Sequence, residues 1–108
     1  MKTINDLVKE VYENAKDKGW HESPRSALEI HMLIVSEVAE ATEAVRSNLL
    51  PILFTESGKP EGEAIELADA VIRIMDYFGS KGWDLQQAID IKHEYNKTRP
   101  YRHGGKVL

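Results

Sequence analysis

Apolar residues recur at intervals of three and four along most of the chain, the spacing that places them on one face of an α-helix. With the turn residues between the periodic stretches, this pattern predicts helices at about residues 4–18, 24–47, 61–78 and 85–97. Short polar side chains and one proline open three of these helices, and glycines follow two of them. The predicted caps and stops are Thr3, Ser23 with Pro24, Asp84, Gly19 and Gly79. No stretch of any length alternates apolar and polar residues as a half-buried strand does.

The second predicted helix, 24–47, is apolar over much of its circumference, so we expect it to be the central and most buried helix. The stretch 48–60 contains helix-breaking prolines and a glycine but is also rich in large apolar residues. We therefore expect a loop that packs on a neighbouring surface, either of the same subunit or of another. Pro100 disfavours helix just before it, and residues 98–108 are predicted to form a mobile tail.

These elements predict an all-α fold, with a single domain over residues 1–108 that resembles a four-helix bundle. The chain has 108 residues and 42% hydrophobic content, which is ordinary for one globular domain with one modest core. Apolar residues between the second and third helices would stay exposed in such a small bundle. We therefore expect the core to be completed by oligomerisation.

Composition excludes several classes of function. A net charge of −4 gives no overall attraction to a nucleic acid polymer or to an anionic membrane. The absence of cysteine excludes disulfides and thiol chemistry. The first residues lack the apolar run of a signal peptide, and no stretch approaches the roughly 18 apolar residues of a membrane span. The expected location is the cytoplasm.

Two short acidic motifs carry the candidate chemistry. Glu37 and Glu40 are three residues apart in the second helix, and Glu66 and Asp69 are three apart in the third, so each pair shares one helix face. Two carboxylates about 5 Å apart repel by about 3 kcal/mol at an effective dielectric of about 20. Four of them gathered together need a counter-charge. All-oxygen ligands favour Mg²⁺, or Mn²⁺, over Zn²⁺.

The position of the first pair argues against a merely solvated acidic face, which is the usual reading of carboxylates at helical spacing. Glu37 lies in the middle of the apolar stripe of its helix, where an unpaired carboxylate is costly. The apolar residues around it at helical spacing are Ile30, Leu33, Ile34, Ala41 and Ala44. The second pair lies at the side of an apolar arc, next to Arg73 and further acidic residues, and is less clearly directed inward.

The order of these motifs resembles that of the MazG-like all-α nucleoside triphosphate pyrophosphohydrolases. Glu-x-x-Glu on one helix is followed by Glu-x-x-Asp on the next, and the ending Lys92-x-x-x-Asn96-x-x-Arg99-Pro resembles that family's C-terminal segment. The early Trp20-His21, followed by Ser-Pro and Arg25, is most similar to the dCTP-hydrolysing members. The resemblance covers nearly the whole chain. It departs from the pattern of many members at Ser36, where those members carry a further Glu.

The resemblance implies attack at the α-phosphate of a nucleoside triphosphate, with release of the monophosphate and pyrophosphate, as in nucleotide-pool housecleaning. It implies Mg²⁺ as cofactor, dCTP-like deoxynucleotides as substrates, and homodimers or homotetramers with active sites near the subunit interface. Metal ligands would be Glu37, Glu40, Glu66 and Asp69, with Glu37 and Glu40 also catalytic. Substrate-binding residues would be Trp20, His21, Arg25, Lys92, Asn96 and Arg99. Ser36 leaves open which carboxylate orients the water: Glu40, Glu43 or Glu63.

Other interpretations remain at this stage. A phosphoribosyl-ATP pyrophosphohydrolase of histidine synthesis would share the acidic motifs. A di-iron carboxylate bundle would need Glu-x-x-His on two helices, and only Asp90-x-x-His93 approaches it. A non-enzymatic helical interaction module would use its acidic stripe for solubility alone. The basic residues Lys92 and Arg99 would in that case complement the dipole of the last helix rather than bind phosphate.

Overall fold

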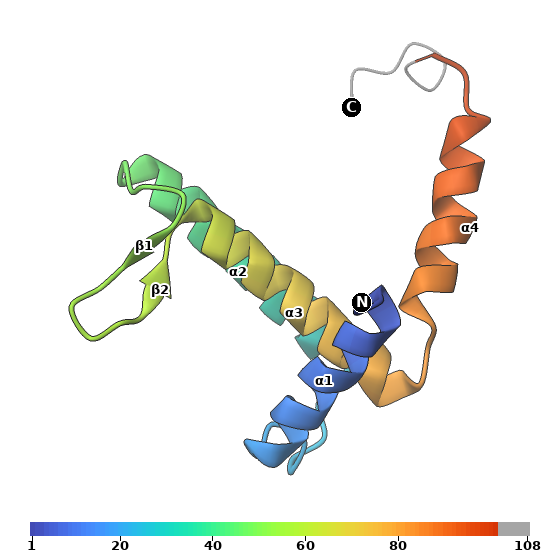
Figure 1. Ribbon diagram of the computed structural model, residues 1–108, viewed down its shortest axis with the longest axis horizontal. Coiled ribbons are helices and arrows are strands. Elements are labelled where there is room, and N and C mark those ends of the chain that lie inside the picture. The colour runs from blue at the N-terminus through green and yellow to red at the C-terminus, as the bar shows by residue number, and fades with distance from the viewer. Residues whose placement is uncertain (102–108) are drawn as a thin grey trace.

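The computed structural model describes residues 1–101, which form an all-helical fold with one small hairpin (Figure 1). The helices are α1 (Ile4–Asp17), α2 (Ala27–Arg46), α3 (Glu63–Lys81) and α4 (Leu85–Lys97). The strands are β1 (Leu53–Phe54) and β2 (Pro60–Glu61), antiparallel, with Leu53 opposite Glu61 and Phe54 opposite Pro60. The predicted all-α class is confirmed. Of the predicted mobile tail, residues 102–108 lie outside the described part, and Thr98 caps α4.

Two of the predicted N-caps are confirmed. The Thr3 hydroxyl accepts a hydrogen bond of 3.0 Å from the backbone N–H of Asp6, whose carboxylate accepts one of 2.9 Å from the N–H of Thr3. This reciprocal arrangement satisfies two N–H groups that the first turn of a helix leaves without partners. Asp84 caps α4 by accepting a hydrogen bond of 2.9 Å from the N–H of Gln87.

The predicted start of the second helix was wrong by three residues. Helix α2 begins at Ala27 with Ser26 as its cap, and Ser23 and Pro24 belong to the preceding loop. The Ser26 hydroxyl accepts from the N–H of Glu29 at 3.1 Å, and Glu29 accepts from the N–H of Ser26 at 3.4 Å. The motif Ser-x-x-Glu satisfies two N–H groups at once, whereas the residue three after Ser23 is Ser26 and not a Glu or Gln.

The predicted end of the third helix was also wrong, because α3 continues through Gly79 to Lys81. A Cβ atom at Gly79 would lie only 2.5 Å from Cβ of Tyr12, so the glycine allows α1 to approach the backbone of α3 closely. The helix ends instead at Gly82, whose φ of +68° is left-handed. At its other end α3 begins at Glu63, two residues later than predicted.

Between α2 and α3 the structure has a hairpin where the sequence predicted an irregular loop. Its turn is closed by hydrogen bonds from the N–H of Thr55 to the carbonyl of Lys59 and from the N–H of Gly58 to the carbonyl of Thr55, both 2.9 Å. Leu50, Ile52 and Phe54 remain more than half exposed. The segment contacts its own chain at the start of α3, where the N–H of Ala64 donates a hydrogen bond of 3.0 Å to the carbonyl of Pro51. Its exposed apolar side chains are not covered there, and their packing on another subunit stays a prediction.

The helices pack around α3. Helix α2 runs along α3, and α1 crosses α3 near its C-terminal end (Figure 1). The buried core joins Val8, Met75 and Leu85. Helix α4 is attached to the start of α1, where Asn5 donates a hydrogen bond of 2.8 Å to Asp84, and it then extends away from the other helices (Figure 1). The four helices therefore do not form a closed bundle within one chain.

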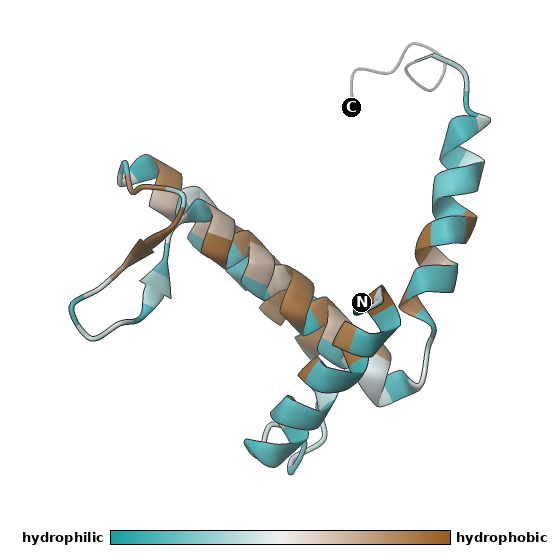
Figure 2. Ribbon diagram, viewed as in Figure 1, coloured by the Kyte–Doolittle hydropathy of each residue, from teal (hydrophilic) through white to brown (hydrophobic). Residues whose placement is uncertain are grey.

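Helix α2 is covered on one side only in a single chain. The prediction that it is the most buried helix is therefore wrong for one chain by itself. Its buried residues are Glu37, Ala41 and Ala44. Large apolar residues on its other faces are 44–75% exposed: Leu28, Met32, Val35, Val38 and Val45. Apolar positions follow both α2 and α3 along their length (Figure 2). None of the helices in residues 1–101 is long and apolar enough to cross a membrane.

Candidate metal site and adjoining cavity

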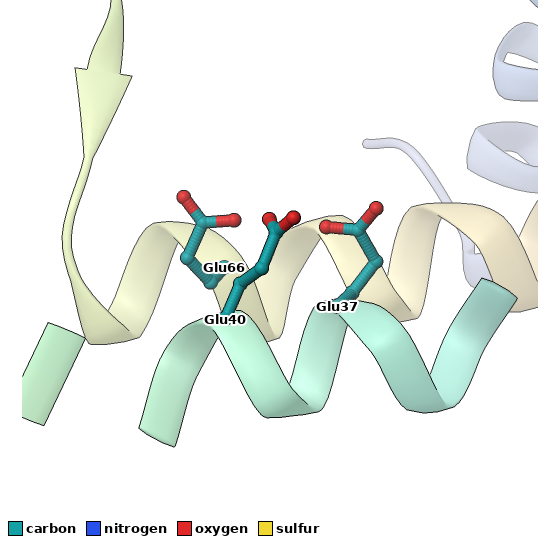
Figure 3. Close-up of side chains that lie close together, drawn as sticks. All are labelled: Glu37, Glu40 and Glu66. Atoms are coloured by element: carbon teal, nitrogen blue, oxygen red, sulfur yellow. The ribbon is translucent and has the colours of Figure 1, made fainter. Parts of the chain in front are cut away.

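Three of the four predicted metal ligands meet between α2 and α3. Glu37 and Glu40 project from successive turns of α2, and Glu66 projects from the first turns of α3 to meet them (Figure 3). One carboxylate oxygen from each residue lies within 4.8 Å of the others. Helical spacing places each pair on one face, and the packing of α2 along α3 brings the two faces together. We call Glu37, Glu40 and Glu66 the carboxylate cluster.

Asp69, the fourth predicted ligand, lies beside this cluster, one turn after Glu66. Its pKa is raised, first by partial burial and then by the negative charge of Glu37, and Arg73 partly offsets the shift. The Asp69 side chain also lines the cavity described below. It therefore stands at the boundary between the cluster and the cavity.

The electrostatics of the cluster are unfavourable without a cation. The pKa of Glu66 is raised, first by burial, then by a hydrogen bond with Glu40 and by that residue's charge, and further by Glu37 and Asp69. A raised carboxyl pKa means that the charged form is disfavoured in the folded protein. A bound divalent cation would reverse this effect.

Glu37 has the most informative environment of the four. It is only 5% exposed, which confirms the burial predicted from its place in the apolar stripe. Its Oε1 accepts a hydrogen bond of 2.8 Å from Nε of Arg73 on α3. Its Oε2 is buried and has no hydrogen-bond partner among the described residues. Buried acceptors are almost always satisfied, so an unpaired carboxylate oxygen inside a group of carboxylates fits a hard cation.

Sequence reasoning had placed Arg73 beside the second acidic pair and gave it no role. The signal was present, because Arg73 is four residues after Asp69 and seven after Glu66, and so lies on the same face of α3. Its partner on α2 was not visible in the sequence. The ion pair with Glu37 joins residues 36 positions apart and depends on how the two helices pack.

A cavity of about 600 Å³ adjoins the carboxylate cluster at Asp69 and Arg73. Its walls come from α1, α2, α3 and the loop between α1 and α2. Three predicted substrate-binding residues line it: Trp20, His21 and Arg25. Its apolar and aromatic lining includes Ile30, Leu33, Ile72 and Tyr77. A cavity of this volume with a few polar groups is typical of small-molecule sites.

The loop residues at the cavity are held by contacts with neighbouring helices and with one another. His21 Nε2 lies 2.8 Å from Oδ1 of Asp76 on α3, and its ring contacts Tyr12 of α1 edge-on, with centroids 5.1 Å apart. The guanidinium of Arg25 lies over the ring of Trp20, 5.6 Å from its centroid. These contacts keep an aromatic surface and a cation at one wall of the cavity.

The structure does not bring the other three predicted substrate residues to this site within one chain. Lys92, Asn96 and Arg99 lie on and just after α4, which extends away from α2 and α3 (Figure 1), and none of them lines the cavity. Lys92 and Arg99 instead lie over the ring of Tyr95, 5.1 and 5.8 Å from its centroid.

Ser36 and the three carboxylates predicted to orient a water, Glu40, Glu43 and Glu63, differ in their surroundings. The Ser36 hydroxyl donates a hydrogen bond of 2.6 Å to the carbonyl of Leu33, within its own helix. Glu43 lies 3.9 Å from Arg46 and, with Glu40 and Glu66, lines a smaller hollow of about 190 Å³. Glu63 is exposed at the start of α3. The role of each of these carboxylates stays a prediction.

Fold and site together define an all-helical domain with a carboxylate cluster between two packed helices, beside a cavity. Comparison of the chain with protein-family models, with characterised proteins and with solved structures gives no match.

Proposed function

We propose that this protein is a divalent-cation-dependent hydrolase of nucleoside triphosphates that releases nucleoside monophosphate and pyrophosphate. The observation that carries the proposal is the buried, unpartnered Oε2 of Glu37 within the carboxylate cluster, next to a cavity large enough for a nucleoside. The order of sequence motifs, which resembles that of MazG-like pyrophosphohydrolases, supports the choice of reaction.

Glu37, Glu40, Glu66 and Asp69 would hold Mg²⁺ or Mn²⁺, because hard cations prefer carboxylate oxygens. When bound, such a cation activates a water and stabilises charge on phosphoryl oxygens. Glu40 is exposed, so it can reach a water or a phosphate at the open side of the cluster. The half-buried Asp69 joins the cluster to the cavity, where the rest of the substrate would lie.

The cavity would receive the base and sugar. Trp20 offers an aromatic face, and Ile30, Leu33 and Ile72 offer apolar surface for a nucleoside. Asp76 and His21 supply polar groups at the same cavity. The favoured substrates in this proposal are deoxynucleoside triphosphates such as dCTP, and the physiological role is housecleaning of the nucleotide pool in the cytoplasm.

A second copy of the chain would complete the site. The uncovered apolar residues of α2 and of the hairpin offer a surface for it. Helix α4, which packs only lightly on its own chain, would bring Lys92, Asn96 and Arg99 to the carboxylates of a partner. This arrangement requires a homodimer or homotetramer.

Two measurements test the proposal. All ribo- and deoxyribonucleoside triphosphates are screened for hydrolysis with Mg²⁺, and the reaction is repeated in ¹⁸O-water. We expect the label on the monophosphate and unlabelled pyrophosphate, because the attack is at the α-phosphate. Release of inorganic phosphate with a diphosphate product would overturn the assignment. An interaction module would hydrolyse nothing, and its thermal stability would not rise with Mn²⁺ concentration.

A further inference from the structure

Arg73 has donors that its ion pair with Glu37 does not use. A guanidinium carries five N–H donors in a fixed planar fork, and only Nε bonds to Glu37. The two terminal nitrogens make no hydrogen bond with the described residues. The Arg73 side chain is 29% exposed and lines the cavity, so these free donors are accessible from it.

Arg73 differs from the other cations of the cavity wall in how it is held. Arg25 lies over the ring of Trp20, and Lys81 lies over the ring of Tyr77, 5.6 Å from each centroid. Both are exposed side chains that lie against aromatic faces. The guanidinium plane of Arg73 is instead fixed by a carboxylate of the cluster itself. It also interacts with the charge of Asp69.

We propose that Arg73 binds a phosphate group of the substrate through its terminal nitrogens while its Nε remains bonded to Glu37. The inference rests on the proposed function, since it assigns a residue to the phosphate side of that site. A fixed guanidinium fork matches two phosphate oxygens, which a single ammonium cannot do. Glu37 would thus serve twice, with Oε2 toward the cation and Oε1 orienting the arginine.

With Arg73 in this role, one chain presents two positive groups to a triphosphate: the divalent cation at the carboxylate cluster and the guanidinium. The predicted phosphate-binding residues Lys92 and Arg99 are not at the carboxylate cluster of their own chain. Arg73 is there, on the same helix as Glu66 and Asp69. A phosphate at the edge of the cavity would then lie between the cation site and the guanidinium.

The test measures binding without turnover. Imidodiphosphate, a pyrophosphate analogue with a P–N–P bridge, is titrated calorimetrically into the full chain with Mg²⁺. Arg73→Met should weaken its binding by about 10- to 150-fold, the effect of losing a hydrogen bond to a charged group. Mn²⁺ alone should bind Arg73→Met at least as tightly as it binds the wild type, because a neighbouring positive charge has been removed. Arg46→Met, which removes an exposed arginine of α2 outside the cavity, is the matched control and should change neither affinity.

Arg73→Lys provides a second variant that keeps the charge next to buried Glu37. It should weaken imidodiphosphate binding by about 10-fold, because an ammonium cannot hold Glu37 and two phosphate oxygens in the fork geometry. Wild-type affinity for imidodiphosphate in either folded variant would overturn the proposal. Loss of Mn²⁺ and imidodiphosphate binding together, with the helical circular dichroism intact, would also overturn it, because Arg73 would then act only through the carboxylates. If the wild type binds imidodiphosphate through Arg73 but hydrolyses no nucleoside triphosphate, the proposed function fails, and what stands is the binding of a phosphate group by Arg73.

Discussion

Glu37 on α2 and Glu66 on α3 each place a carboxylate oxygen within 4.8 Å of the other, although neither has a basic residue on its own helix turn to neutralise it. Within residues 1–101 the one ionic partner of the pair is Arg73, whose Nε donates to Oε1 of Glu37. The remaining negative charge raises the pKa of Glu66. We therefore expect the stability of the protein to depend on divalent cations and on pH.

Glu37→Gln should remove most of the stabilisation by divalent cations. The amide loses the charge of Oε2 but can still accept the hydrogen bond from Arg73, so the helical fold should persist. Differential scanning calorimetry with increasing Mn²⁺ measures the effect, because a ligand that binds only the folded state raises the melting temperature with its free concentration. Glu13→Gln, an exposed carboxylate of α1, is the control. An unchanged Mn²⁺ response in Glu37→Gln would remove Glu37 from the site.

Glu66→Gln should change how stability without metal depends on pH. The folded protein holds a proton on Glu66 to higher pH than the unfolded chain does, since burial and Glu40 raise its pKa. The free energy of unfolding therefore falls as the pH rises from the ordinary carboxyl range through the raised pKa, and the penalty persists above it. The variant lacks this contribution. Its stability relative to the wild type should increase with pH over that window.

Urea denaturation in the presence of a chelator, from about pH 4 to pH 8, measures that difference. With Mn²⁺ the trend should reverse, because metal binding requires deprotonated carboxylates and so strengthens with pH in the wild type. A constant difference between Glu66→Gln and the wild type across the range would show that the carboxylate cluster is not electrostatically strained.

Activity at substrate concentrations well below KM should be restored by mixing two weakly active variants. Glu37→Gln lacks the carboxylate site, and Lys92→Ala lacks a cation of α4 that does not reach the cavity of its own chain. If α4 serves the partner's site, a mixed dimer contains one site with neither substitution. When equal amounts are refolded together, half of the dimers should be mixed, and one of the two sites in each mixed dimer should be intact. The mixture should then have about a quarter of the wild-type activity.

The control for this experiment is each variant refolded alone, which should stay weakly active. Lys92→Ala alone should lower kcat/KM by about 10- to 150-fold, the effect of losing a hydrogen bond to a charged group. Most of this fall should come from a raised KM and less from kcat, because the contact is made equally in the ground state and the transition state. A Lys92→Ala protein with wild-type kinetics and a lowered melting temperature would assign Lys92 to the C-terminal dipole of α4 instead.

Gly62→Ala should destabilise the junction between the hairpin and α3. Gly62 has φ +116°, and a Cβ atom there would overlap the carbonyl oxygens of Leu50 and Pro51. A residue with a side chain pays about 1–3 kcal/mol of backbone strain at this φ, and the overlap adds to that cost. The free energy of unfolding should therefore fall by roughly 3 kcal/mol or more. Gly58→Ala is the matched control, since Gly58 has φ +86° but open space around it, and should cost about 1–2 kcal/mol. Equal losses in urea denaturation would contradict the predicted overlap.

The sequence by itself determined the number of helices and most of their boundaries. Periodic apolar residues and local caps such as Thr3 and Asp84 depend on contacts within one turn, and such contacts can be read from neighbouring residues. The burial of Glu37 also followed from the sequence, because its helical neighbours are apolar. The errors at Ser23 and Gly79 have separate causes. Ser26 with Glu29 made a better local cap, and the approach of Tyr12 gave Gly79 a packing role.

Only the tertiary structure decided which groups meet across helices. The ion pair of Arg73 with Glu37, the contact of His21 with Asp76 and the cavity beside Asp69 depend on the rotation of α3 against α2 and α1. Helical periodicity states which face a residue occupies but not which residue of another helix faces it. The outward course of α4 was likewise invisible, because its apolar positions predict burial without naming the surface that buries them.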